Sequence, residues 1–128
     1  MDIPDKLKTN KLKAKDRRKQ KGAAGEALAA QFCLAHDYVI TERNWRRAAG
    51  EIDIIAEKNG VTYFIEVRSR SGTDFGTPVE SIDRAKKEQI IKTASRYMAE
   101  QGRELMCEFA VAAVHLDKRE VELIFDIL

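Results

Sequence analysis

Two apolar segments, residues 51–57 and 61–69, stand on either side of an Asn59-Gly60 pair and form the clearest pattern in the chain. Asn-Gly favours a two-residue type I′ turn, because both central residues of that turn need positive φ. The flanking residues are rich in Ile, Val, Tyr and Phe, which favour strands. The pattern therefore predicts an antiparallel hairpin.

Successive side chains of a strand point to opposite faces of the sheet, so the sequence also predicts which residues share a face. In the second strand, Tyr63, Ile65 and Val67 lie on one face and Phe64, Glu66 and Arg68 on the other. In the first strand, Ile52, Ile54 and Ala56 oppose Glu51, Asp53 and Ile55. Each strand thus has one apolar face for a core. Each also carries an acid, Asp53 or Glu66, near the middle of the other face, where the two can meet.

Helical periodicity precedes this hairpin. Residues 22–36 predict an amphipathic helix, with Leu28, Phe32 and Ala35 at positions i, i+4 and i+7 and Ala24 one turn earlier. This apolar stripe is expected to cover one face of the sheet.

Three further strands and a second long helix complete the pattern. Strands are predicted over residues 38–45, 107–115 and 121–128, and the helix over residues 82–101 with Gly102 as its stop. The second hairpin strand, this helix and the next strand form a right-handed crossover, which makes the two strands parallel. The order helix, three strands, helix, two strands gives an α/β fold with a central mixed sheet and flanking helices.

The two facing acids allow two interpretations. Like charges directly opposite each other destabilise a sheet. The first interpretation is a solvated face on which Arg68 and Arg70 neutralise Asp53 and Glu66. The second is a divalent-cation site, because Mg²⁺ takes one or two carboxylates and keeps water ligands for a substrate phosphate.

Four segments in a fixed order favour the second interpretation. They are GEALAAQFCLAHDYVITERNWR, GEIDII, FIEVRSR and FGTPVESIDRAKKEQI. An acid, a hairpin turn and then Glu-x-Lys on the next strand is the signature of the PD-(D/E)XK nuclease superfamily; the matching positions here are Asp53, Glu66 and Arg68. Together the segments resemble the YraN-like family of small bacterial proteins, which is similar to Holliday-junction resolvases. The resemblance covers residues 21–128.

This resemblance implies a restriction-endonuclease-like fold and metal-assisted phosphodiester hydrolysis, with DNA, including branched or recombination intermediates, as the expected substrate. Asp53 and Glu66 would hold Mg²⁺ or Mn²⁺, with the Val67 carbonyl as a further ligand. Glu26 matches an acid on the first helix that reaches the metal site, although an ordinary first-turn Glu is also favoured by the helix dipole. Symmetric cleavage of two strands implies a homodimer.

Position 68 departs from the superfamily pattern. The usual lysine orients or helps to deprotonate the attacking water, whereas Arg68 keeps its proton and is a bidentate phosphate clamp. The acids Glu26, Asp53 and Glu66 favour an endonuclease in which they and Arg68 are the catalytic residues. Arg68 itself favours the alternative, a nucleic-acid-binding or recombination accessory protein that has the nuclease fold but little or no cleavage activity.

Charge is unevenly spread along the 128 residues. Residues 1–22 contain nine basic and three acidic residues, a net charge of +6, whereas the remainder contains 14 basic and 18 acidic residues, a net charge of −4. A basic arm over residues 1–20 is therefore expected to precede a single domain over residues 21–128. Such an arm binds phosphate backbones electrostatically. A disordered, solubilising tail is the alternative, and it is equally open.

Basic residues outside the arm predict where nucleic acid would lie. Three arginines precede Asp53 and one follows Glu66. Two lysines occupy the first turns of the second helix, which directs them towards the end of the strand that carries Glu66. The predicted nucleic-acid-binding set is Arg43, Arg46, Arg47, Arg70, Lys86 and Lys87.

Other features narrow the class of protein. No apolar run approaches the roughly 18 residues of a transmembrane helix, and the basic start lacks the apolar segment of a secretory signal. A cytoplasmic protein is therefore expected. Cys33 and Cys107 lack CxxC or His spacing, so free buried thiols are expected in place of a zinc site. Trp45 is expected to pack against the core or to stack on a base.

Overall fold

The computed structural model describes residues 22–72 and 78–128. The arm expected over residues 1–20 and part of the loop after Arg70 lie outside the described residues. Within them, residues 22–35 form a helix, called the N-terminal helix below. The later elements are β1 (Val39–Arg47), β2 (Gly50–Lys58), β3 (Val61–Arg70), α2 (Arg84–Gln101), β4 (Met106–His115) and β5 (Glu120–Phe125). The predicted order of helices and strands is confirmed.

The described strands form one five-stranded mixed sheet in the order β1-β2-β3-β4-β5. Neighbouring strands are antiparallel except for β3 and β4, which are parallel and are joined through α2. The β2–β3 hairpin turns at Asn59 and Gly60, whose φ values of 52° and 78° are those expected for Asn-Gly. The α/β fold with a mixed sheet and flanking helices is confirmed, and it is consistent with a restriction-endonuclease-like fold.

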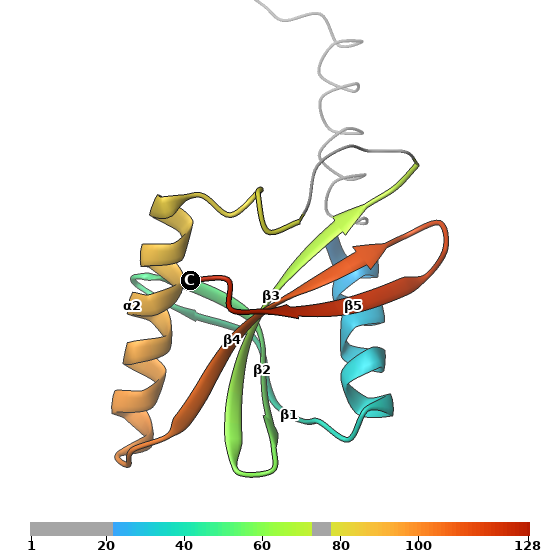
Figure 1. Cartoon of the computed structure of the whole chain (residues 1–128). Helices are drawn as coiled ribbons and strands as arrows, with labels where there is room; N and C mark the ends of the chain where they lie inside the picture. The colour runs from blue at the N-terminus through green and yellow to red at the C-terminus, as the bar shows by residue number, and fades with distance from the viewer. Residues whose placement is uncertain (1–21, 73–77) are drawn as a thin grey trace, which may run out of the picture.

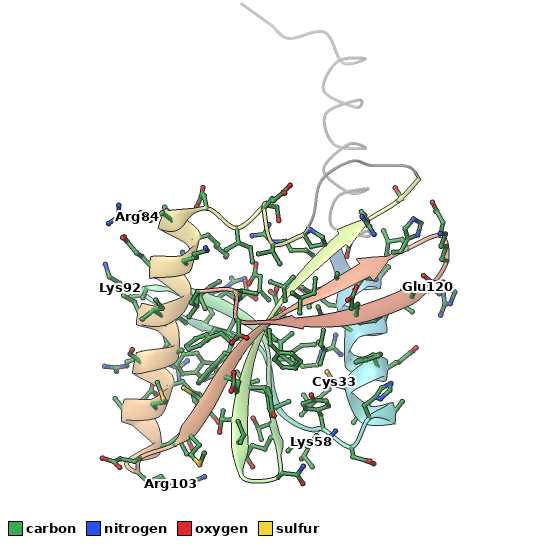
Figure 2. All side chains as sticks on the ribbon, viewed as in Figure 1. Cys33, Lys58, Arg84, Lys92, Arg103 and Glu120 are labelled. Atoms are coloured by element: carbon green, nitrogen blue, oxygen red, sulfur yellow. The ribbon has the colours of Figure 1, made fainter. Side chains whose placement is uncertain are left out.

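The two helices of the described chain lie on opposite sides of the sheet (Figure 1). The N-terminal helix packs through Ala29 and Cys33 onto a face that includes Ile54 and Ile65. Helix α2 covers the other face, where Tyr97 packs against Phe64. Figure 2 shows Arg84 and Lys92 projecting from α2 away from the sheet. Neither of these two helices is long and apolar enough to cross a membrane.

The buried stripe of the N-terminal helix differs from the predicted one. Ala24 and Ala35 are exposed, whereas small residues at Gly25, Ala29 and Cys33 are buried. A Cβ at Gly25 would overlap the Oγ of Ser69 on β3. The helix approaches the sheet more closely than a stripe of large side chains would allow, and this brings its first turns next to the end of β3.

The predicted faces are right for β3 but wrong for Ile52 in β2. Ile54 packs on the side of the N-terminal helix, whereas Ile52 packs with Trp45 on the α2 side. The ladder is irregular here: Asn44, between the β1 partners of Ile54 and Ile52, takes a left-handed conformation with φ 52°. The β2–β3 ladder begins only at Ile54, opposite Ile65. Before Ile54, β2 pairs with β1 alone, so the hairpin strands have separated when they reach Asp53 and Glu66.

Helix α2 begins slightly later than predicted. Asp83 is its N-cap, and its carboxylate accepts a hydrogen bond of 2.8 Å from the Lys86 backbone N–H. Ile82 precedes the helix and is buried with Ile90. The predicted stop at Gly102 is confirmed, because this residue takes a left-handed conformation with φ 67°.

Candidate active site

An acid pair lies where β2 and β3 separate. The backbone N–H of Val67 donates a 2.7 Å hydrogen bond to Asp53 Oδ2, so the Asp53 carboxylate fills the gap beyond the hairpin ladder. Glu66 is adjacent to Val67 on β3, and its carboxyl group lies close enough to that of Asp53 for each to shift the pKa of the other. The expected meeting of Asp53 and Glu66 is therefore seen, and we call these two residues the acid pair.

Burial dominates the electrostatics of the acid pair. Glu66 is only 9% exposed. Desolvation, followed by the charge of Asp53, raises the pKa of Glu66 to about 7. Desolvation also raises the pKa of Asp53, although the Val67 N–H opposes that shift. Both acids of the pair therefore keep their protons to a higher pH than ordinary carboxyl groups, Glu66 most clearly.

Two cations approach the same oxygen of the acid pair. Arg68 on β3 places a terminal guanidinium nitrogen, Nη2, 3.4 Å from Glu66 Oε1, and Lys86 on α2 places Nζ 3.6 Å from that atom. Both cations lower the pKa of Glu66, but less than burial and Asp53 raise it. Ion pairing therefore does not offset the cost of placing these acids together.

These observations decide against a solvated sheet face. Glu66 is buried, and Asp53 accepts a hydrogen bond from a backbone N–H. Arg68 pairs with Glu66 as that interpretation expected, but Arg70 is exposed at the end of β3. Buried carboxylates that retain a proton near neutral pH are typical of functional sites.

Glu26 occupies an adjoining cluster. The hydrogen-bonding network requires the side-chain nitrogen of Asn44 to face Glu26 and Glu51. In this orientation the nitrogen lies 3.0 Å from Glu26 Oε2 and 3.2 Å from Glu51 Oε1. Burial and then the charge of Asp53 raise the pKa of Glu26, so Glu26 interacts electrostatically with the acid pair. The N-terminal helix thus brings Glu26 to the edge of the site, where Asn44 holds it.

The acid pair fits a hard divalent cation. Within residues 22–72 and 78–128, no three His, Cys, Asp or Glu side chains lie close enough together to hold a metal ion, so the predicted third ligand Glu26 does not complete a preformed set. Asp53 and Glu66 nevertheless offer carboxylate oxygens close together, and a cation would offset the repulsion that raises the pKa of Glu66. Mg²⁺ and Mn²⁺ favour carboxylate and water ligands and need few protein ligands.

The predicted nucleic-acid-binding residues divide into three groups. Lys86 reaches the acid pair. Arg46 pairs with Glu51 at 3.1 Å but stays 76% exposed, while Arg43, Arg70 and the half-buried Lys87 lie on the surrounding surface. Arg47 contacts Glu100 and Trp45, as described next.

Arg47 ties the end of β1 to α2. Its Nε and Nη2 donate hydrogen bonds of 2.9 and 3.0 Å to the Glu100 carboxylate. Its guanidinium also lies 4.1 Å from the ring centroid of Trp45, which is buried against Tyr97. The expectation that Trp45 packs in the core is met, and three of the five N–H groups of Arg47 already have protein acceptors, two in Glu100 and one in the Arg46 carbonyl.

The sequence analysis missed two residues that organise the site. Asn44 takes a left-handed conformation with φ 52°, which Asn tolerates better than most residues and which turns its amide towards Glu26. Gln89 accepts a 3.3 Å hydrogen bond from Lys86 Nζ. An Asn in the middle of a strand was a detectable signal for the first residue; no sequence pattern indicated the second.

Comparison with known proteins agrees with the four ordered segments. The sequence profile of the uncharacterised protein family UPF0102 matches residues 25–124. A UPF0102 protein of Moorella thermoacetica is 43% identical over 104 residues, which cover 80% of this chain and 87% of that protein. A UPF0102 protein of Symbiobacterium thermophilum is 45% identical over 94 residues, covering 73% and 80%. The chain therefore belongs to the UPF0102 family, which is the YraN family.

Proposed function

We propose that the protein is a divalent-cation-dependent nuclease that hydrolyses phosphodiester bonds in nucleic acid, with DNA as the expected substrate. The Asp53–Glu66 pair, in which Asp53 is half-buried and Glu66 buried, carries this proposal, because its acids are held together at a cost that folding alone does not require. Arg68 and Lys86 beside it supply positive charge for a phosphate. The names of the relatives state no activity.

Each residue has a separate role in this proposal. Asp53 and Glu66 would hold Mg²⁺ or Mn²⁺ in their ionised forms. When bound, the cation would polarise the phosphodiester and lower the pKa of a water molecule. Arg68 would bind the phosphate and stabilise its developing charge, but it cannot accept a proton. Glu26, held by the Asn44 amide, would add a negative charge at the edge of the site.

Branched DNA is the preferred substrate class in this proposal. The likeness of the YraN family to Holliday-junction resolvases supports it, and so does the exposed basic surface that includes Arg43, Arg46 and Arg70. Symmetric cleavage of two strands would need two copies of the site, which a homodimer would supply.

A second function is favoured by one specific contact. Arg68 pairs with Glu66 at 3.4 Å where a catalytic lysine was expected, and a guanidinium on that carboxylate competes with a cation. A recombination accessory protein that binds nucleic acid without cutting it would retain this contact.

Cleavage assays separate the two functions. The full chain is incubated with end-labelled branched, flapped and linear DNA, and with RNA, in Mg²⁺, Mn²⁺ or EDTA. A nuclease should cut at least one substrate with metal and none in EDTA. Glu66→Gln should abolish cutting, and Glu104→Gln, at an exposed position between α2 and β4, should not. Binding of these substrates without cutting in any metal would support the accessory protein and contradict the nuclease.

A further inference from the structure

Lys86 is held at the acid pair from a different element. It lies in the first turn of α2, where its backbone N–H is fixed by the Asp83 cap, and its side chain is only 28% exposed. Its Nζ lies 3.6 Å from Glu66 Oε1 and 3.3 Å from Gln89 Oε1. An ordinary surface lysine keeps its ammonium in water; this one is directed inwards.

The cations beside Glu66 have unused hydrogen-bonding capacity. The contacts of Arg68 and Lys86 to Glu66 Oε1, at 3.4 and 3.6 Å, are longer than a good charged hydrogen bond. The Nε of Arg68 is buried and has no hydrogen-bond partner among the described residues. A buried donor without an acceptor is destabilising. An anionic oxygen that reached this Nε would satisfy it.

The surroundings of Lys86 are both fixed and open. Gly50, at the start of β2, lies against Gln89, and a Cβ at this glycine would come within 2.7 Å of Gln89 Cγ. The β1–β2 turn thereby confines Gln89, which in turn contacts Lys86. A hollow of about 570 Å³ between this turn and α2 is lined by Ala49 and Lys86 and opens to the surface. A phosphate can therefore approach Lys86 from outside.

We propose that Lys86 is the catalytic lysine of the site: its ammonium, supplied by α2, contacts the phosphate that is cleaved, and Arg68 Nε contacts the same phosphate from β3. This inference rests on the proposed function. Lys86 acts as a fixed positive charge and hydrogen-bond donor to a non-bridging phosphate oxygen. Because Lys86 on α2 already supplies the ammonium group, a lysine at position 68 is not required. Arg68→Lys should therefore not raise cleavage.

Phosphate binding tests this proposal without requiring activity. Inorganic phosphate is titrated into the ¹⁵N-labelled full chain, with Mg²⁺ and with EDTA, while the side-chain N–H signal of Arg68 Nε is followed by NMR. The wild type should show a saturable shift. Lys86→Met should weaken binding at least tenfold, Lys86→Arg should restore most of it, and Lys118→Met, in the exposed β4–β5 turn, should change it less than twofold. Preserved backbone spectra of the variants establish that they fold.

DNA cleavage supplies the second measurement. Lys86→Met should lower kcat at least 100-fold with a much smaller effect on KM, since the proposed contact is to the reacting phosphate. If wild type cuts and Lys86→Met cuts equally well, Lys86 is not catalytic although the nuclease stands. If Lys86→Met loses phosphate binding but wild type cuts nothing, the phosphate contact stands and the nuclease fails. Absence of phosphate binding at Arg68 in wild type, equal binding in Lys86→Met, or faster cleavage by Arg68→Lys would each overturn the proposal.

Discussion

At the scale of one residue, Glu66 lowers the stability of the fold, because a carboxyl group is buried next to another acid. Its carboxyl group is buried beside Asp53, and two nearby cations do not restore its ordinary acidity. A Gln or Thr at this position would fold with less electrostatic conflict. Such conflict is typical of sites in which a ligand supplies the missing charge.

The first prediction concerns the pH dependence of stability without metal. Below about pH 4.5, Glu66 is protonated in both folded and unfolded chains. Between its ordinary pKa of 4.5 and its folded pKa of about 7, the unfolded chain loses the proton and the folded chain keeps it, so stability falls as pH rises. Glu66→Gln should remove much of this fall, which amounts to roughly 3 kcal/mol by pH 8.

Urea unfolding in EDTA at pH 5 and pH 8 measures this effect, with Glu104→Gln as the control. Asp53 and Glu26, whose pKa values are also raised, should leave a smaller slope of the same sign in Glu66→Gln. A wild type whose stability rises between pH 5 and pH 8 would show that Glu66 is not the strained acid described above.

The second prediction concerns the close approach at Gly25. Because a Cβ there would overlap Ser69 Oγ, Gly25→Ala should lower the free energy of unfolding by about 1–3 kcal/mol, despite the better helix propensity of alanine. Ser69→Ala in the same chain removes that oxygen and should recover part of the loss. Gly22→Ala, where a Cβ meets nothing within 4 Å, is the matched control. If Gly25→Ala were as stable as this control, the helix would have room to move away from β3.

At the scale of elements, the site depends on how β1, β2 and α2 are held together. Arg47 joins the end of β1 to Glu100 near the end of α2, and Gly50 lets the β1–β2 turn reach Gln89 near its start. Both contacts fix the helix that carries Lys86. The hydrogen bonds with Glu100 raise the pKa of Arg47 and lower that of Glu100, as expected for a pair that is stabilised in its charged form.

The third prediction separates Arg47 from the other basic residues near the site. Arg47→Ala should lower the melting temperature, because the Glu100 and Trp45 contacts are lost, with little change in DNA affinity. Arg46→Ala should do the reverse, since this side chain is 76% exposed and pairs only at the surface with Glu51. Thermal melts and DNA titrations of both variants measure the two effects. Weaker DNA binding by Arg47→Ala than by Arg46→Ala would return Arg47 to the nucleic-acid-binding set.

Local patterns predicted the elements better than they predicted the faces. The Asn59-Gly60 turn and the Gly102 stop follow from short-range chemistry, and the parallel β3–β4 pair follows from the order strand, helix, strand; each is present. The orientation of Ile52 and the role of Gln89 depend on where two strands separate and on what packs across them. Such tertiary contacts cannot be read from the hydrophobic periodicity of a single strand or helix.

The candidate site divides in the same way. The meeting of Asp53 and Glu66 follows from the hairpin, and the fold places Lys86 beside them, where the crossover from β3 through α2 directs it. The position of Glu26 depends instead on Asn44 and on the tight packing at Gly25. Neither contact is visible from spacing along the chain.

At the scale of the whole molecule, charge is divided between the two parts of the chain. Residues 1–22 carry a net charge of +6 and the remainder a net charge of −4. The fourth prediction is that removing residues 1–21 weakens DNA binding and flattens its salt dependence, because fewer counterions are released. Affinity measured across a range of NaCl concentrations tests this, and equal slopes for the full and shortened chains would exclude a role for the segment.

The most direct test of the cation site compares thermal melts of wild type and Asp53→Asn, each in EDTA and in Mn²⁺. In EDTA, Asp53→Asn should melt higher, because it removes a charge from the acid pair while an amide oxygen can still accept from the Val67 N–H. In Mn²⁺ at a hundredfold excess over the dissociation constant, wild type should gain about 2.7 kcal/mol and the mutant much less. A wild type indifferent to the metal, together with a destabilised Asp53→Asn, would contradict the assignment of Asp53 and Glu66 as a cation site.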